Sequence, residues 1–308
     1  MLDPSCQKLL RLLAMGGSPP RPDDIGARRE NFRKLLDVAG GVAPATVVTR
    51  DDAVETAAGA LLYRSYRRRD AAAAELATCV FLHGGGFVAG SIDTHDRICR
   101  VLAEASGWQI LSVDYRLAPE DTFPAQIEDG MAMLSAVAAE PRRFGADPAA
   151  LAVAGDSVGA GLAAHLARKW RDEGHDALAL QVLLCPALEA EPRHPSRQEF
   201  ARGYYIEDQM IAADFSAYRG ARTDVPSVSA DLGGLPPAII HVADCDPFRD
   251  EGLAYAEALA RAGVRVETTR HPGMLHLFHA FGKFIPAGPA ALRAAGAQMR
   301  AHVDAAAR

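Results

Sequence analysis

The sequence lacks several features that would place a protein in a broad class at once. It has no uncharged apolar run of the roughly 20 residues that a bilayer-spanning helix needs. The leucines near the N-terminus are interrupted by Lys8 and Arg11, which favours an amphipathic helix over a secretion signal. Basic residues are not in excess either, since 33 Lys and Arg face 39 Asp and Glu. Nucleic-acid binding needs a basic surface, so the sequence predicts neither a membrane-spanning nor a nucleic-acid-binding protein.

Cysteines are few and show no pattern of pairing. The chain has five, an odd number, and none has the spacing of a metal site. Cys79 and Cys185 lie in apolar, strand-like runs, where a free thiol behaves as a small hydrophobic side chain. We therefore expect reduced thiols and a cytoplasmic location.

The composition that remains is that of an ordinary globular protein, with 308 residues, 49% hydrophobic and 23% charged. Short β-rich runs alternate with segments of helical length, which predicts an α/β protein with a mostly parallel sheet flanked by helices. The expected strands are 78–83, 109–114, 151–154, 180–185, 238–243 and 264–269, with edge strands between about 45 and 65. The expected helices are 94–106, 124–139, 158–174, 251–262 and 288–305.

Two stretches interrupt this alternation. One is residues 1–44, with leucine and phenylalanine at helical spacing, and the other is residues 189–235, which is rich in aromatic residues. The second follows a strand, on the side of an open α/β sheet where ligands bind. We expect the two stretches to form a helical cap, which leaves 45–188 and 236–308 as the two parts of the core.

The most informative motif is the G-x-S-x-G pentapeptide from Gly155 to Gly159. An apolar strand-like run precedes it and a helical segment follows it, which is the context of a nucleophile elbow. On such a turn the serine hydroxyl is exposed above the sheet. This context predicts Ser157 as a catalytic nucleophile.

A second glycine-rich segment, His83-Gly84-Gly85-Gly86-Phe87, follows an apolar strand. Successive glycines let backbone N–H groups converge on an anion, and H-G-G-G is a known oxyanion motif of esterases. No Gly-Lys-Ser/Thr follows, so a phosphate loop is disfavoured. We expect Gly85 and Gly86 to donate to an oxyanion, together with the N–H of Val158.

A serine nucleophile needs a base, and ten histidines are present. The candidates that come after the last expected strand are His271, His276 and His279. His276 follows a Pro-Gly turn that can bring it back over the strand ends, so it is the predicted base.

The acid of this fold lies between serine and histidine in the chain. Asp244, Asp246 and Asp250 all follow the strand 238–243. Asp246 precedes Pro247, which rigidifies the turn, and is the preferred acid. Asp250 is expected to cap the next helix or to pair with Arg249.

These motifs resemble the bacterial hormone-sensitive-lipase family of α/β-hydrolases, in its GDSAG-type branch. The resemblance spans most of the chain and rests on segments in the family's order: 83–91, 112–120, 123–125, 155–159, 246–252 and 273–278. It implies Ser157, Asp246 and His276 as the triad and Gly85, Gly86 and Val158 as oxyanion donors. The segment 115–120 is expected to brace the oxyanion loop through Arg116 and Glu120.

The chain departs from the family pattern at two places. The elbow continues with Gly159-Ala160-Gly161 where Gly-Gly-Asn is usual, and Leu277 follows the catalytic histidine where glycine is usual. Neither change removes a catalytic group.

The sequence therefore predicts a serine carboxylesterase for short- to medium-chain acyl esters, with no metal or organic cofactor. An amidase, deacetylase or lactonase would use the same residues. A non-catalytic ligand receptor on this scaffold is disfavoured, because such proteins lose the catalytic histidine. A homodimer through an edge strand is possible by the resemblance.

Overall fold

The structure is a computed structural model that describes residues 1–17, 20–71, 75–190, 193–222 and 231–306. Its described strands form one eight-stranded sheet in the order β1-β2-β4-β3-β5-β6-β7-β8. The first two pairs, β1 with β2 and β2 with β4, are antiparallel, and every other pair is parallel. The strands are β1 (Val47–Thr56), β2 (Gly59–Arg68), β3 (Leu76–Leu82), β4 (Gln109–Val113), β5 (Ala146–Asp156), β6 (Leu180–Leu184), β7 (Ala238–Cys245) and β8 (Val266–Leu275).

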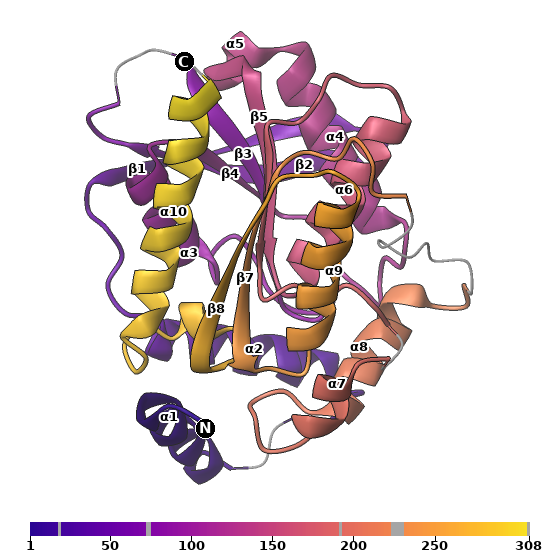
Figure 1. Cartoon of the computed structure of the whole chain (residues 1–308). Coiled ribbons are helices and arrows are strands. Elements are labelled where there is room, and N and C mark those ends of the chain that lie inside the picture. The colour runs from indigo at the N-terminus through magenta and orange to yellow at the C-terminus, as the bar shows by residue number, and fades with distance from the viewer. Residues whose placement is uncertain (18–19, 72–74, 191–192, 223–230, 307–308) are drawn as a thin grey trace.

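Helices cover both faces of this sheet (Figure 1). The core helices are α3 (Asp96–Ser106), α4 (Ala125–Ala139), α5 (Pro141–Phe144), α6 (Val158–Asp172), α9 (Arg249–Arg261), η1 (Phe278–Ala280) and α10 (Ala287–Ala306). In Figure 1, α3 and α10 lie on one side of the sheet, and α4, α6 and α9 lie on the other. Each face therefore has its own hydrophobic core.

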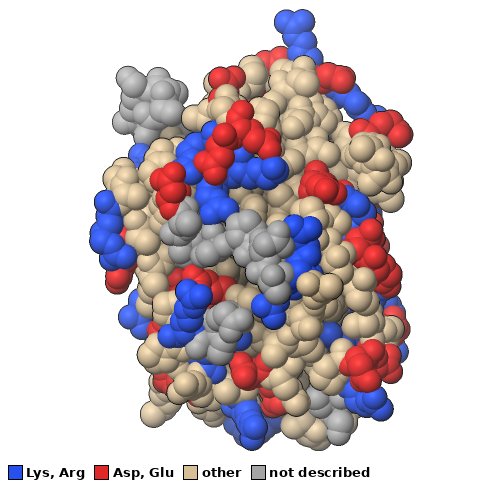
Figure 2. All heavy atoms as spheres, turned by 90° about the vertical axis from the view of Figure 1, so that its right-hand side faces the viewer, with Lys and Arg blue, Asp and Glu red and all other residues tan. Residues whose placement is uncertain are grey.

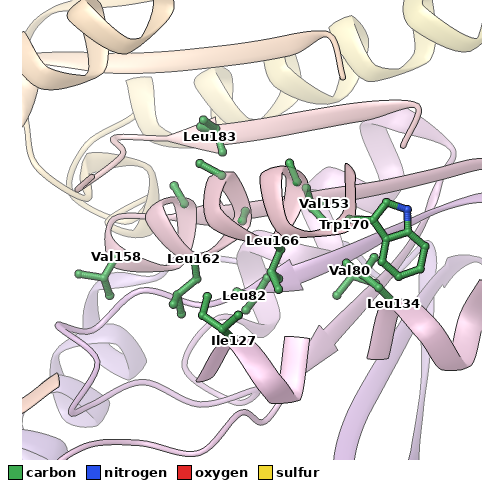
Figure 3. Packing of buried hydrophobic residues seen from close by; sticks show 14 of the residues in the cluster. Val80, Leu82, Ile127, Leu134, Val153, Val158, Leu162, Leu166, Trp170 and Leu183 are labelled. Atoms are coloured by element: carbon green, nitrogen blue, oxygen red, sulfur yellow. The ribbon is translucent and has the colours of Figure 1, made fainter. Parts of the chain in front are cut away.

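The packing of α6 shows how sequence spacing builds this core. Leu162, Leu166 and Trp170 recur every four residues, so they share one face of the helix and are buried. Figure 3 shows this row beside Val80 and Val153 of the central strands. Because β3, β4 and β6 are covered on both faces, most of their residues are apolar and show no strict alternation with polar ones.

The remaining described helices lie beyond one end of the sheet, at the bottom of Figure 1. They are α1 (Pro4–Met15), α2 (Ile25–Ala39), α7 (Pro195–Glu199) and α8 (Asp208–Arg219). Aspartates cap the first two, with Asp3 accepting the N–H of Ser5 and Asp24 that of Ala27. Residues 191–192 and 223–230 of the expected cap insert lie outside the described residues.

The predicted α/β architecture, a mostly parallel sheet flanked by helices, is confirmed, and so is each core strand and helix expected from the sequence. Two expectations need correction. The last strand runs through Leu275 rather than ending at 269, so His276 follows the strand directly. The strand expected at 151–154 extends from Ala146 to Asp156.

Candidate active site

Ser157 sits at the sharp turn between β5 and α6. Its φ of 54° and ψ of −126° are strained for a residue with a side chain, as expected of a nucleophile elbow. Its N–H donates to the carbonyl of Leu184 over 2.9 Å, and its own carbonyl accepts the N–H of Ala187 over 3.0 Å. The turn is thereby fixed to the chain that leaves β6.

The structure brings the three predicted triad residues together. Nε2 of His276 lies 2.8 Å from Oγ of Ser157, and Nδ1 lies 2.8 Å from Oδ2 of Asp246. The other carboxylate oxygen of Asp246 accepts the N–H of Phe248 over 2.8 Å, which fixes its rotamer. All three side chains are buried, with Ser157 the most exposed at 7%. The arrangement fits the catalytic triad of a serine hydrolase.

The competing aspartates and histidines lie elsewhere. Asp244 accepts two hydrogen bonds from Arg270. Asp250 accepts a hydrogen bond from Arg249 and one from the N–H of Ser196. His241 and His271 contact each other over 3.1 Å.

The glycine loop, which we define as residues 83–89, lies beside the elbow. Gly85, Gly86 and Phe87 have φ values of 125°, 67° and 63°, so three consecutive residues adopt left-handed backbone. The carbonyl of His83 accepts the hydroxyl of Tyr115 over 2.6 Å, and the ring of Tyr115 stacks on that of His83 at 4.3 Å. Among the described contacts, no protein acceptor takes the N–H of Gly85 or Gly86. Both donors are therefore available to a ligand.

Asp156 is an organising residue that the sequence analysis missed. Its Oδ1 accepts the N–H of Gly84 over 3.0 Å, and its Oδ2 lies 3.3 Å from Nε2 of His95 and 3.8 Å from Nε2 of His279. Burial alone would raise the pKa of Asp156, but the two imidazoles outweigh it and hold that pKa well below its usual value. An acidic residue before the nucleophile was visible in the sequence, but its partners come from distant segments.

The segment 115–120 braces the glycine loop by a different route from the one expected. Arg116 pairs with Asp129 of α4 instead of the glycine loop. Glu120 binds Arg29 of α2 through two hydrogen bonds, and Arg29 in turn donates to the carbonyl of Val88. The backbone completes the brace, since the N–H of Ala118 donates to the carbonyl of Phe87.

The departures from the family pattern have structural counterparts. A Cβ added at Gly161 would collide with the carbonyl oxygen of Ala187, so this close approach of α6 requires glycine. Ala160 is fully buried in α6. Leu277 is buried at 3% and adopts left-handed backbone with φ of 60°.

Outside the triad, the described residues offer no candidate metal site, and a cavity lies to one side of the catalytic residues. Within the described residues, no group of three or more His, Cys, Asp or Glu is placed to hold a metal ion. A cavity of about 170 Å³ lies between α2, α3 and α10 and has His279 in its wall, but Ser157, Asp246 and His276 do not line it. In the same described part of the chain, no helix has the length and apolarity to cross a membrane.

Fold and site together define a serine hydrolase with an α/β-hydrolase core. Residues 79–280 match the model of a protein family that is described as having the alpha/beta hydrolase fold. The chain belongs to this family, in agreement with the resemblance to hormone-sensitive-lipase-type enzymes.

Curated relatives carry esterase names. Carboxylesterase NlhH of Mycobacterium tuberculosis is 40% identical over 69% of each chain. Ethyl acetate hydrolase of Pseudomonas putida is 34% identical over 92% of this chain and 94% of its own length.

Solved structures agree with these relatives. An ester hydrolase, EH1AB1, from the metagenome of Lake Arreo has a TM-score of 0.92 at 36% identity, and the alignment covers 99% of this chain and all of the other. The esterase of Pyrobaculum calidifontis has a TM-score of 0.91 at 36% identity, covering 98% of this chain and 99% of the other. With the Ser–His–Asp arrangement, these relatives make the chain a carboxylic ester hydrolase.

Proposed function

We propose that this ester hydrolase uses Ser157 as nucleophile, His276 as general base and Asp246 as the acid that orients it. The observation that carries the proposal is the unbroken chain of two 2.8 Å contacts from Ser157 Oγ through His276 to Asp246. Asp246 would hold the proton of His276 on Nδ1, so that Nε2 is free to accept the serine proton.

The reaction follows from this geometry. As Ser157 Oγ attacks the ester carbonyl, its proton passes to Nε2 of His276. The negative charge on the former carbonyl oxygen is met by the N–H groups of Gly85, Gly86 and Val158. His276 then protonates the leaving alcohol, and a water molecule repeats the sequence on the acyl-enzyme. No step calls for a metal or organic cofactor.

We further propose that residues 1–44 and 189–235 form a cap over a core made of 45–188 and 236–308. The support is that α2 and α8, one from each segment, both contact the glycine loop. Arg29 of α2 donates to Val88, and Tyr218 of α8 stacks on Phe87 at 3.9 Å.

The substrate class that we propose is short- to medium-chain acyl esters. A relative that aligns over 92% of this chain is named for the hydrolysis of ethyl acetate, an ester with a two-carbon acyl group. Large aromatic side chains of the proposed cap, Phe215 and Tyr218, pack against the loop that would hold the oxyanion, which leaves less room for a long chain.

The decisive experiment is a turnover panel of esters, amides and lactones with acyl chains of graded length. We expect esters with two to about eight acyl carbons to be hydrolysed fastest, and Ser157→Ala to lose several orders of magnitude in kcat. Preferred turnover of amides or lactones would favour the alternative acyl hydrolases. Full turnover by Ser157→Ala would exclude the mechanism.

Location and assembly stay predictions. A cytoplasmic location is supported by the five cysteines, which are all free and buried. A homodimer through an edge strand would pair two copies at β1 or at β8, which are the two edges of the sheet.

On the face shown in Figure 2, basic and acidic side chains are mixed. This mixture supports a small neutral substrate instead of a polyanion.

A further inference from the structure

Two helices from opposite parts of the chain meet over the glycine loop. Arg28 of α2 and Asp214 of α8 are 186 residues apart in sequence, and Nη2 of Arg28 forms an ion pair with Oδ1 of Asp214. The pair is largely shielded from water, with side-chain exposures of 9% and 14%. Arg28 is further fixed by a hydrogen bond to the carbonyl of Pro22 over 3.2 Å.

The second oxygen of the Asp214 carboxylate lies directly against the glycine loop. A Cβ built on Gly86 would collide with Oδ2 of Asp214, and Gly86 has a φ of 67°. A larger residue at this position would have to displace the carboxylate and adopt left-handed backbone. The ion pair thus touches one of the residues whose N–H we assign to the oxyanion.

The same helix holds the next residue of the loop. The rings of Phe87 and Tyr218 stack with centroids 3.9 Å apart and planes 10° apart, and Phe215 meets Phe87 edge-on at 5.4 Å. Phe87 has left-handed backbone with φ of 63°, a conformation that is unfavourable for a residue with a Cβ. Such a conformation persists only where neighbouring contacts hold it.

A small apolar cluster completes the contact. Val88, Ala89 and Ala118 are buried together, and Ile25 and Phe32 of α2 and Ala217 of α8 pack against them. Both helices therefore clamp the loop along residues 86–89, and the ion pair between Arg28 and Asp214 joins one helix to the other.

We propose that Arg28 and Asp214 are positioning residues for the oxyanion hole: their ion pair holds α8 on Gly86 and Phe87 and so keeps the N–H groups of Gly85 and Gly86 aimed at the reacting carbonyl. This rests on the proposed function. Burial raises the pKa of Asp214 to about 7 although Arg28 opposes it, so the carboxylate depends on Arg28 for its charge near neutral pH.

The consequence is kinetic and specific. An oxyanion hole acts on the transition state more than on the bound ester, so its misalignment lowers kcat while KM stays nearly constant. A complete loss of one donor costs about 10²–10³ in kcat, and a displaced loop should cost less. We expect Arg28→Gln and Asp214→Asn each to lower kcat about 10- to 100-fold, with KM within about threefold of wild type.

The experiment measures kcat and KM for p-nitrophenyl acetate and butyrate with wild type, Arg28→Gln, Asp214→Asn and the double variant. Because the two residues act as a unit, the double variant should be no slower than the slower single variant. Arg28→Lys, which keeps the charge, should recover part of kcat. Arg33→Gln is the matched control, since Arg33 lies on the same helix in exposed ion pairs with Glu30 and Asp37, and its kinetics should be those of wild type.

A second measurement does not depend on turnover. Hydrogen exchange of the peptide covering residues 84–91 should be faster in Asp214→Asn than in wild type and unchanged in Arg33→Gln. Single variants with wild-type kcat, a rise in KM alone, additive losses in the double variant, or unchanged exchange would each overturn the proposal. If wild type lacked ester turnover, the proposed function would fail, while the exchange experiment would still test the clamp.

Discussion

The Oδ1 oxygen of Asp156 accepts the backbone N–H of Gly84 over 3.0 Å, so the residue before the proposed nucleophile also holds the first glycine of the glycine loop. Its other oxygen faces His95 of α3 and His279 of η1. Because His279 lies three residues after His276, one buried carboxylate connects the three segments that would carry nucleophile, base and oxyanion donors.

Replacement of Asp156 should therefore damage activity and stability together. Asp156→Asn replaces the buried carboxylate that faces His95 and His279 by a neutral amide, and losing a hydrogen bond to a buried charged group typically costs about 1.5–3 kcal/mol. The glycine loop should also shift, and kcat should fall by about tenfold to 10³-fold. Urea unfolding and ester kinetics measure the two effects. Asp37→Asn, at an exposed ion pair, is the control and should leave both close to wild type.

The assignment of Asp246 as the triad acid can be tested with two matched variants, one at Asp246 and one at Asp244. Asp246→Asn should lower kcat about 10⁴-fold, because an amide cannot hold the proton of His276 on Nδ1. Asp244→Asn should cost less than about tenfold, since Asp244 pairs with Arg270 at a partly exposed site. Steady-state kinetics at saturating ester decide between them. The reverse order of effects would show that Asp246 is not the acid.

Gly161 offers a test of the unusual elbow. Gly161→Asn restores the side chain that the family usually has there, but its Cβ would collide with the carbonyl oxygen of Ala187. Overpacking of this kind costs about 1–3 kcal/mol or more. Since the N–H of Ala187 bonds the carbonyl of Ser157, kcat should fall as well.

The neighbouring departure provides the control for that variant. Ala160→Gly lies one residue earlier on the same helix and removes atoms instead of adding them. It should cost about 2 kcal/mol, from the penalty of glycine in a helix and the loss of one buried methyl group, and it should leave kcat close to wild type. Denaturant midpoints for both variants measure the difference, and equal losses would show that the contact with Ala187 is easily relieved.

Buried histidines should make the protein sensitive to acid. Burial lowers the pKa of His165 and of His241 to about 4, and Arg168 also contributes at His165. The unfolded chain, with an ordinary pKa of about 6.5, binds these protons first as pH falls. Stability should thus be full above about pH 7 and decline between about pH 6.5 and 4, by up to about 3 kcal/mol for each histidine.

The measurement is the free energy of unfolding in urea at pH 8, 6.5, 5.5 and 4.5. His165→Leu removes one of these titrations, so its stability should fall less steeply with acid than that of wild type. An unchanged slope would mean that His165 takes up its proton in the folded state as readily as in the unfolded state.

Much of this molecule could be predicted from its sequence because the decisive signals are local. Strand β5, the turn at Ser157 and the start of α6 at Val158 follow one another within a few residues, and the glycines of 84–86 likewise come directly after β3. Strand order and the extent of β8 depend on neighbours in the sheet, which local pattern does not reveal. The partners of Asp156, Arg29 and Asp214 lie between 59 and 186 positions away in the chain, so one sequence cannot show them.

The ion pair between Arg28 and Asp214 also limits how this enzyme could be re-engineered. Its two partners come from segments that are separated by the whole first part of the core, residues 45–188. A chimaera that exchanges only the segment containing α8 would place a foreign helix against the native α2. The buried Arg28 would then lose its ion-pair partner, Asp214. Transplants intended to change ester preference should therefore carry the N-terminal helices and the later insert as a matched set.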